Sequence, residues 1–395
     1  MKQFVNRIKK ITNNVDTCEK CIIKLFLDIN NINYNNSKFF VLYFSNIDSI
    51  IYNKIKQIFI SFKIEPSILS LVEIFEMLIP EDEKKNNGIV YTPDSVKQLI
   101  IHYVMGKKTI GKICDPSCGC GSFLISCAIY LHKTYQISYK EVFEYYIYGI
   151  DISEKSIIKA QILFRFIMLL NNENDNNCKY NLKISDSLNK QNNPFKNIKF
   201  DYVVGNPPYV RSKNIENAVK KNLKTWKTSE SGNVDLYIPF FELGLNLLKT
   251  NGTLGYITPN TYLQSVNGRA LRNYLKDSNY HIRIIDYKDN KIFKKATNYT
   301  AVTIISKDSA RFKITYMPIN NIEETDNLPY VNYDNSNFKY NQPWKMCGSN
   351  YLSTINIINQ MENKLGKYKI KNGLATLKND IYFFTPVLED EQYYY

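Results

Sequence analysis

Histidine and tryptophan are rare in this chain: its 395 residues include three histidines and two tryptophans. His102, His132 and His281 stand apart from one another, so the sequence has no histidine-rich metal motif. The eight cysteines lack the regular spacing of a disulfide framework. Cys18-Glu-Lys-Cys21 has no second Cys/His pair at ligand spacing behind it, and we predict no bound metal.

Long hydrophobic runs are absent as well. No stretch approaches the roughly 18 uncharged apolar residues of a membrane span. The N-terminus at 1–10 is basic with no apolar region after it, unlike a signal peptide. We therefore expect no membrane partner and a reducing, cytoplasmic location.

Acidic residues are outnumbered by basic ones, 37 against 51, which gives a net charge of +14. Such a balance favours a polyanionic partner such as nucleic acid. The chain is also rich in Asn, Ile, Lys and Tyr, and a biased base composition would supply many lysines without any such partner. The charge alone leaves both interpretations open.

The length is sufficient for two or three domains, and we divide the chain at residues 85 and 310. Residues 1–85 are predicted to be a helical region, ending in a charged stretch at 81–87 that we interpret as a solvated linker. Helical periodicity is found at Ile22–Ile29, Ile50–Ile60 and Ile68–Leu78. Residues 311–395 are expected to be an irregular linker followed, from Gly373, by the start of a target-recognition domain.

Residues 86–310 alternate short apolar runs with helical periods, which predicts an α/β fold with a parallel sheet covered by helices on both faces. The predicted strands are Lys112–Asp115, Ile147–Asp151, Leu182–Ser185, Phe200–Gly205, Thr253–Thr258, Ile282–Asp286 and Thr300–Ser306. The predicted helices are Phe123–Lys133, Glu154–Leu170, Leu236–Leu248 and Gly268–Leu275, with a short helix capped by Ser138.

A glycine-rich loop, Cys114-Asp-Pro-Ser-Cys-Gly-Cys-Gly-Ser-Phe123, joins the first strand to the first helix. Its glycines allow the backbone to approach a ligand at the helix N-terminus. Asp115 lies at the carboxyl end of the strand, where open α/β sheets bind ligands. An acidic residue beside the loop disfavours a phosphate and favours a cationic amine.

Carboxylates also end the next two strands, at Asp151 and Asp186. The first position accepts hydrogen bonds from ribose hydroxyls in nucleotide-binding sheets, and the second is placed for an adenine amino group. Taken singly, each is more often a turn residue. Three carboxylates at three successive strand ends are better explained by a shared ligand.

A further motif precedes the loop: Gly88-Ile-Val-Tyr-Thr-Pro93 leads into a helix. Thr92 is predicted to cap that helix and Pro93 to occupy its first position. The capping role does not prevent Tyr91 and Thr92 from lining a pocket.

The run Gly205-Asn-Pro-Pro-Tyr209 follows a buried strand. Two prolines stiffen the loop and remove two N–H groups. A rigid loop with an amide oxygen, a free carbonyl and an aromatic ring fits a planar ligand that carries an amino group. Adenine, cytosine and a glutamine amide all match this description.

Together, these motifs and their order resemble the gamma class of N6-adenine DNA methyltransferases, the group containing type I modification subunits and type IIG enzymes. The similarity covers roughly residues 85–306, and it includes the segments 235–237, 252–259 and 268–272. It implies a Rossmann-like methyltransferase sheet, S-adenosylmethionine as cofactor and double-stranded DNA as substrate. It also implies a place in a restriction-modification or related defence or epigenetic system.

The resemblance also assigns residues. It implies cofactor contacts from Tyr91, Thr92, Pro93, Asp115, Ser117, Gly119, Gly121, Phe123, Asp151, Ile152, Asp186 and Ser187. It implies a catalytic loop of Asn206, Pro207, Pro208 and Tyr209, in which Asn206 and the Pro207 carbonyl hold the target amino group. Tyr209 would stack on the flipped base, and we expect Phe293, or else Tyr299, on the opposite face.

Two features depart from the family pattern. Cys120 replaces the usual Ser or Thr of the loop, with little expected effect because the loop acts through its backbone. About 23 residues follow Gly373, whereas a recognition domain needs on the order of 100 or more. We therefore expect a fragment, a decayed gene or one half of a split enzyme, assisted by a separate specificity polypeptide.

Three alternatives remain open from the sequence. A protein glutamine methyltransferase also uses Asn-Pro-Pro-Tyr on an amide nitrogen. N4-cytosine methylation is possible, although that group more often begins the motif with Ser. An idle DNA-binding subunit of a larger complex is the third.

Overall fold

The computed structural model describes residues 1–12, 14–106, 109–230, 232–288, 299–307, 311–319 and 329–348, with isolated positions at 354, 357 and 360. The chain divides into two compact units, Met1–Ser349 and Asn350–Tyr395. Everything below concerns the first unit. The predicted recognition segment from Gly373 lies outside the described residues.

The N-terminal region consists of helices. They are α1 (Lys2–Ile8), α2 (Val15–Ile29), α3 (Lys38–Tyr43), α4 (Ser49–Phe62), α5 (Ile68–Leu78) and α6 (Glu81–Asn87). Side chains of Asn14, Ser37, Asp48 and Ser67 accept hydrogen bonds from the first turns of the helices that follow them. No helix in the described ranges has the length and apolar composition needed to cross a bilayer.

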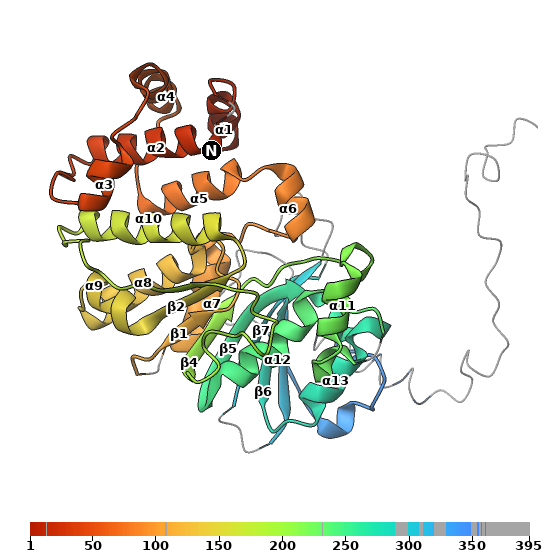
Figure 1. The fold of residues 1–395 in the computed structure, drawn as a ribbon. Coiled ribbons are helices and arrows are strands. Elements are labelled where there is room, and N and C mark those ends of the chain that lie inside the picture. The colour runs from red at the N-terminus through yellow and green to blue at the C-terminus, as the bar shows by residue number, and fades with distance from the viewer. Residues whose placement is uncertain are drawn as a thin grey trace, which may run out of the picture. The chain divides into compact units, whose positions relative to one another are not determined.

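A nine-stranded mixed sheet lies below these helices, in the order β3-β2-β1-β4-β5-β7-β6-β8-β9 (Figure 1). The strands are β1 (Ile113–Asp115), β2 (Ile147–Asp151), β3 (Asn181–Ile184), β4 (Phe200–Gly205), β5 (Leu248–Pro259), β6 (His281–Asp286), β7 (Thr300–Ser306), β8 (Lys313–Pro318) and β9 (Val331–Asp334). Strands β1 to β5 pair in parallel, as predicted. Strand β7 is antiparallel to both of its neighbours.

Helices cover both faces of the sheet. The remaining helices are α7 (Asp94–Met105), α8 (Ser122–Tyr135), α9 (Tyr139–Glu141), α10 (Glu154–Leu170), α11 (Asn217–Leu223), α12 (Tyr237–Leu247) and α13 (Arg269–Lys276). A β-carbon built at Gly255 of β5 would meet Val104 and Ile100 of α7, whereas Leu254 and Tyr256 approach Gly244 of α12. Alternate residues of β5 therefore pack against helices on opposite faces.

The structure corrects the sequence prediction in three places. Residues 81–87 form helix α6 rather than a linker, because three acidic residues stabilise its first turn and Gly88 ends it in a left-handed conformation. The parallel prediction is wrong for β7, which pairs directly with the strand before it, as antiparallel strands do. The sheet also continues into β8 and β9, beyond residue 310, where we expected irregular structure.

The helical region is attached to the sheet domain through α10, which contacts both α5 and α8 (Figure 1). The buried carboxylate of Asp175, 1% exposed, accepts a hydrogen bond from Ser37 at 2.8 Å and pairs with Arg165 at 3.1 Å. The buried Glu19 of α2 pairs with Lys159 of α10 at 2.7 Å. Both contacts join residues distant in sequence, so they bind the two regions together.

We predict that Asp175→Ala lowers the free energy of unfolding by about 2–3 kcal/mol, because it leaves a partly buried guanidinium and a buried hydroxyl without their acceptor. Denaturant unfolding measures the change. Lys249→Ala is the control: its side chain is 49% exposed in a surface pair with Asp201, and its loss should cost under about 1 kcal/mol. Equal losses in the two variants would contradict the structural role of Asp175.

Candidate active site

Polar side chains gather at the carboxyl edge of the parallel strands. β1 ends at Asp115 and β2 at Asp151, and Asp186 follows β3 by two residues. Asn206 comes directly after β4. A β-carbon at Gly205 would lie 2.7 Å from Asp115 Oδ1. Only glycine permits this approach. The residue before Asn206 therefore lies directly against the Asp115 carboxylate.

The glycine-rich loop after β1 is held to the neighbouring strand by its own backbone. Ser117 N donates to Asp115 Oδ1 and Gly119 N donates to Asp151 Oδ2, each at 2.9 Å. Gly119 and Gly121 have positive φ angles of 53° and 84°. A β-carbon at Gly121 would press on Ala160, but one at Gly119 would meet no atom within 4 Å. The loop therefore presents bare backbone to open space at Gly119.

Burial changes the ionisation of this edge. Burial, with a smaller contribution from the nearby Asp151 charge, raises the pKa of Asp115 to about 7. Burial also raises the pKa of Asp151, and the N–H groups of Ser153 and Gly119 oppose that rise. Two adjacent carboxylates with raised pKa values bind a cationic ligand more readily than an anionic one.

The third strand end is tied to the first. Ser187 Oγ donates to the Pro116 carbonyl at 2.5 Å. Asp186 accepts a hydrogen bond from Leu188 N at 2.9 Å, a turn contact that occupies one carboxylate oxygen. Ile152, next to Asp151, is 75% exposed. An exposed apolar side chain beside a carboxylate offers a surface for a flat ring.

The side-chain amide of Asn206 has a fixed orientation. Its Nδ2 donates to the Val90 carbonyl at 2.8 Å and to Thr92 Oγ1 at 2.9 Å. A carbonyl oxygen can only accept, so the amide nitrogen must face Val90. Oδ1 therefore points the other way, where it is buried and has no hydrogen-bond partner among the residues that the structure describes.

The 88–92 segment supports this arrangement along its length. Gly88 O accepts a hydrogen bond from Tyr209 N at 3.0 Å, and Gly88 has a φ of 62°. Thr92 does not cap α7 as predicted: Pro93 occupies the N-cap position and no side chain caps the helix. The Thr92 hydroxyl instead accepts from Asn206. Tyr91 is 37% exposed beside this contact.

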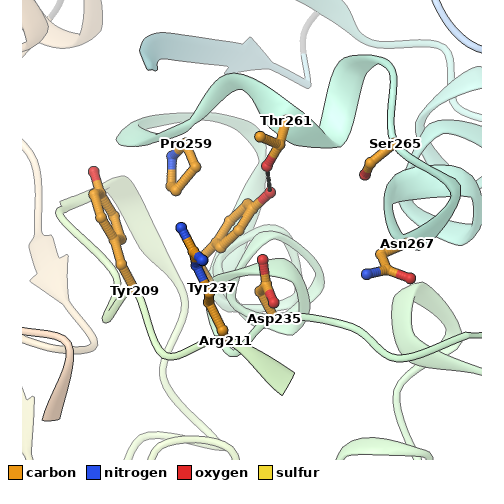
Figure 2. A pocket seen from close by; sticks show the side chains of 8 residues that line it. All are labelled: Tyr209, Arg211, Asp235, Tyr237, Pro259, Thr261, Ser265 and Asn267. Carbon is orange, nitrogen blue, oxygen red and sulfur yellow. Dashed lines mark hydrogen bonds between the residues drawn. The ribbon is translucent and has the colours of Figure 1, made fainter. Parts of the chain in front are cut away.

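A small pocket of about 180 Å³ opens beside the catalytic loop (Figure 2). It is lined by Tyr209, Arg211, Asp235, Tyr237, Pro259, Thr261, Ser265 and Asn267. In Figure 2 the Tyr209 ring and the Pro259 ring appear on the same side of the view, and the Tyr237 hydroxyl is 3.1 Å from Thr261 Oγ1. The volume lies below the roughly 300–1,000 Å³ of sites for drug-sized ligands, so one flat ring system is the natural occupant.

Buried contacts fix the walls of this pocket. The Tyr209 hydroxyl donates to the Ile257 carbonyl at 3.2 Å, and Asp235 accepts from Ser212 N at 3.0 Å. Arg272, 2% exposed, donates to the carbonyls of Tyr262 and Ser265. These hydrogen bonds hold the backbone of the loop that carries Thr261 and Ser265.

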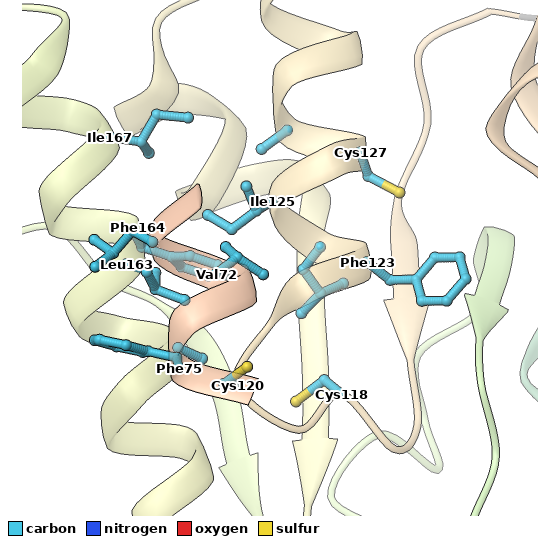
Figure 3. Packing of buried hydrophobic residues seen from close by; sticks show 14 of the residues in the cluster. Val72, Phe75, Cys118, Cys120, Phe123, Ile125, Cys127, Leu163, Phe164 and Ile167 are labelled. Carbon is cyan, nitrogen blue, oxygen red and sulfur yellow. The ribbon is translucent and has the colours of Figure 1, made fainter. Parts of the chain in front are cut away.

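The three predicted aromatic positions have different outcomes. Phe123 is 4% exposed, and Figure 3 shows its ring directed away from the cluster around Phe75 and Phe164. Phe293 lies outside the described residues. Tyr299 is 43% exposed, and its carbonyl accepts a hydrogen bond from Asn260 N.

Several pocket residues were not assigned from the sequence. Asp235, Tyr237 and Pro259 fall in segments that resemble the family, but the sequence pattern predicts no individual function for them. Ser265 and Asn267 belong to no motif recognised in the sequence. Their place depends on a loop that follows β5 and returns beside the catalytic loop, which no local pattern encodes.

Comparison with known proteins agrees with this geometry. Residues 131–293 match the model of the Eco57I restriction-modification methylase family. The type II restriction enzyme and methyltransferase RM.Eco57I of Escherichia coli is 26% identical over 89% of this chain and 41% of its own length. The chain spans less than half the length of the curated relatives that it matches.

Solved structures share the fold. The type ISP restriction-modification enzyme LlaGI, as a nuclease-deletion mutant bound to a DNA substrate mimic, matches 86% of this chain and 40% of its own with a TM-score of 0.58 at 17% identity. A Listeria monocytogenes protein described as a class I S-adenosylmethionine-dependent methyltransferase matches 78% of this chain and 94% of its own, with a TM-score of 0.52 at 18% identity.

The fold is therefore that of the class I S-adenosylmethionine-dependent methyltransferases. Within that fold, residues 131–293 are similar to the Eco57I restriction-modification methylase family.

The ionisation of Asp115 gives a testable consequence. Its pKa of about 7 in the folded protein lies above the roughly 3.9 of an unfolded aspartate, so the wild type loses stability as the pH rises from about 4 to 7. Asparagine does not titrate. Asp115→Asn should therefore gain stability relative to wild type across this window, reaching about 4 kcal/mol at pH 8. Urea unfolding without cofactor at pH 5 and pH 8 measures it, and a difference that stays constant with pH would be the contrary result.

Proposed function

We propose that this chain transfers a methyl group from S-adenosylmethionine to the N6 amino group of an adenine flipped out of DNA. The observation that carries the proposal is the buried, unpartnered Oδ1 of Asn206 among the described residues. Leaving a buried acceptor unpaired costs about 1–3 kcal/mol. The cost is recovered when a ligand N–H occupies the position.

The carboxyl edge supports the cofactor assignment. Asp115 faces the cationic amino-acid end, Asp151 accepts from the ribose hydroxyls, and Asp186 accepts from the adenine amino group. The bare backbone at Gly119 gives the cofactor room, and exposed Ile152 covers one face of its ring. When bound, the cofactor supplies an electrophilic methyl group on a sulfonium.

The catalytic loop acts on the amino group of the target. That nitrogen is a poor nucleophile because its lone pair is conjugated with the ring. Asn206 Oδ1 and the Pro207 carbonyl accept hydrogen bonds from its two N–H groups. At this geometry the nitrogen lone pair is directed out of the ring plane. Asn206 Oδ1 does not have to reorganise, because Val90 and Thr92 already hold the amide. Positioning, rather than a general base, provides the catalysis.

The pocket beside the loop receives the flipped base. Unstacking costs a few kcal/mol, and stacking on an aromatic face returns roughly 1–3 kcal/mol per base. Tyr209 supplies one face. Pro259 lines the same pocket, and Phe293, which lies outside the described residues, is the proposed second face.

DNA is the substrate that the surroundings of the pocket favour. The segment after the catalytic loop carries Arg211, Lys213, Lys221, Lys224 and Lys227, all exposed. Cationic side chains in this position can contact phosphates next to a flipped base. The relatives are named as type II restriction-modification enzymes, so a protein glutamine methyltransferase is not favoured.

Asn206→Ala should reduce methyl transfer by at least about 100-fold with little change in cofactor affinity, because the acceptor it removes is used mainly in the transition state. Radiolabelled methyl transfer and calorimetry give the two quantities. Nucleoside mass spectrometry should identify the wild-type product as N6-methyladenine. Asn246→Ala, an exposed asparagine on α12, is the matched control. N4-methylcytosine as the product would select the cytosine alternative, and a fully active Asn206→Ala would overturn the catalytic assignment.

We also expect this chain to bind DNA through phosphates, with an affinity that falls steeply with salt and depends little on sequence. Site-selective methylation should then require a separate specificity polypeptide or further recognition residues. Single-molecule sequencing of DNA methylated by this chain alone tests the expectation. One sharp motif modified to completion would show that residues 306–395 suffice for recognition.

A further inference from the structure

A further carboxylate lies at the glycine-rich loop, and it comes from the helical region. Glu76 is on α5, whose neighbouring residue Phe75 packs beside Cys120 of the loop (Figure 3). Glu76 Oε2 is buried and, among the described residues, has no hydrogen-bond partner. Burial raises the pKa of Glu76 to about 7, against the opposing effects of the Lys97 charge and a hydrogen bond with Ser122.

A buried cation accompanies it. Lys97 of α7 is 2% exposed, and its ammonium donates to Ser122 Oγ at 3.0 Å. Asp94 lies 3.5 Å from the same ammonium. Ser122 is the first residue of α8, directly after Gly121. Ser122, at the end of the glycine-rich loop, therefore hydrogen-bonds with both Glu76 and Lys97.

The pair also adjoins the 88–92 segment. Burial raises the pKa of Tyr91, and the charges of Glu73, Glu76 and Asp94 raise it further. Lys97 lies in the first turn of α7, which follows the 88–92 segment directly. Its bond to Ser122 places it between 88–92 and 115–123, the two stretches of chain assigned above to the cofactor.

We infer that Glu76 and Lys97 bind the amino-acid end of the cofactor. Glu76 Oε2 accepts from the α-ammonium, and the Lys97 ammonium donates to the α-carboxylate. A zwitterion needs one acceptor and one donor of opposite charge, and this pair supplies both from separate elements. The inference rests on the proposed function, since it names further residues of the same cofactor site.

A purely structural pair is the competing explanation. Burying two charges costs several kcal/mol per ion unless their remaining hydrogen-bonding positions are filled. If Glu76 and Lys97 served only to hold the helices together, protein groups would be expected to occupy all of their hydrogen-bonding positions. Glu76 Oε2 has no such partner among the described residues. A ligand that occupies this position explains the open acceptor, whereas the structural role does not.

Two ligands separate the explanations. S-adenosylhomocysteine and 5′-methylthioadenosine are both neutral thioethers of adenosine, and they differ in the amino-acid end. Glu76→Gln and Lys97→Met should each weaken S-adenosylhomocysteine binding about tenfold or more, since each removes a charged hydrogen bond. Binding of 5′-methylthioadenosine should stay within about twofold of wild type. Calorimetry measures the first ligand, and the shift in melting temperature at millimolar concentration measures the second.

Glu65→Gln, an exposed carboxylate just before α5, is the control and should bind both ligands as wild type does. If the two variants keep their affinity for S-adenosylhomocysteine, or lose both ligands equally, the pair is structural and the inference is wrong. Should Glu76→Gln fail to fold, the Lys97→Met variant decides by the same comparison. A wild-type protein that binds neither ligand contradicts the proposed cofactor itself, which is a different failure.

Discussion

The contact between the 88–92 segment and the loop at 206–209 determines the rest of the site. Its hydrogen bonds run from Tyr209 N to Gly88 O and from the Asn206 amide to Val90 O and Thr92 Oγ1. They fix which end of the Asn206 amide faces the pocket and hold the Tyr209 backbone beside it. A loop stiffened by two prolines still needs this support, because proline restricts the backbone and leaves the asparagine side chain free to rotate.

The carboxyl edge is organised for binding at the expense of stability. Asp115 and Asp151 lie close together in a buried position, and each has a raised pKa. Backbone N–H groups of Ser117 and Gly119 offset part of the cost. The remaining cost favours a positively charged ligand, because a cation would lower the free energy of both carboxylates at once.

The helical region contributes to the same site rather than only covering the sheet. Its α2 and α3 are attached by the buried contacts of Glu19 and Asp175, and α5 packs against the glycine-rich loop. That placement brings Glu76 to Ser122. The loop therefore packs against a helix that ends well upstream of it in the chain.

The sequence alone determined the α/β alternation, the seven strands from β1 to β7 and the order of the motifs, because apolar periodicity, glycine spacing and proline pairs are local properties. It also placed Asp115, Asp151 and Asn206 at strand ends, since each motif begins where an apolar run stops. Tertiary structure alone decided the direction of β7, the addition of β8 and β9, and the role of Thr92, whose hydroxyl binds Asn206 rather than its own helix. It also decided the lining of the pocket and the contacts of Glu76 and Lys97 with Ser122. These features join residues far apart in the chain, and their energies come from burial and hydrogen bonding between elements, which no local pattern records.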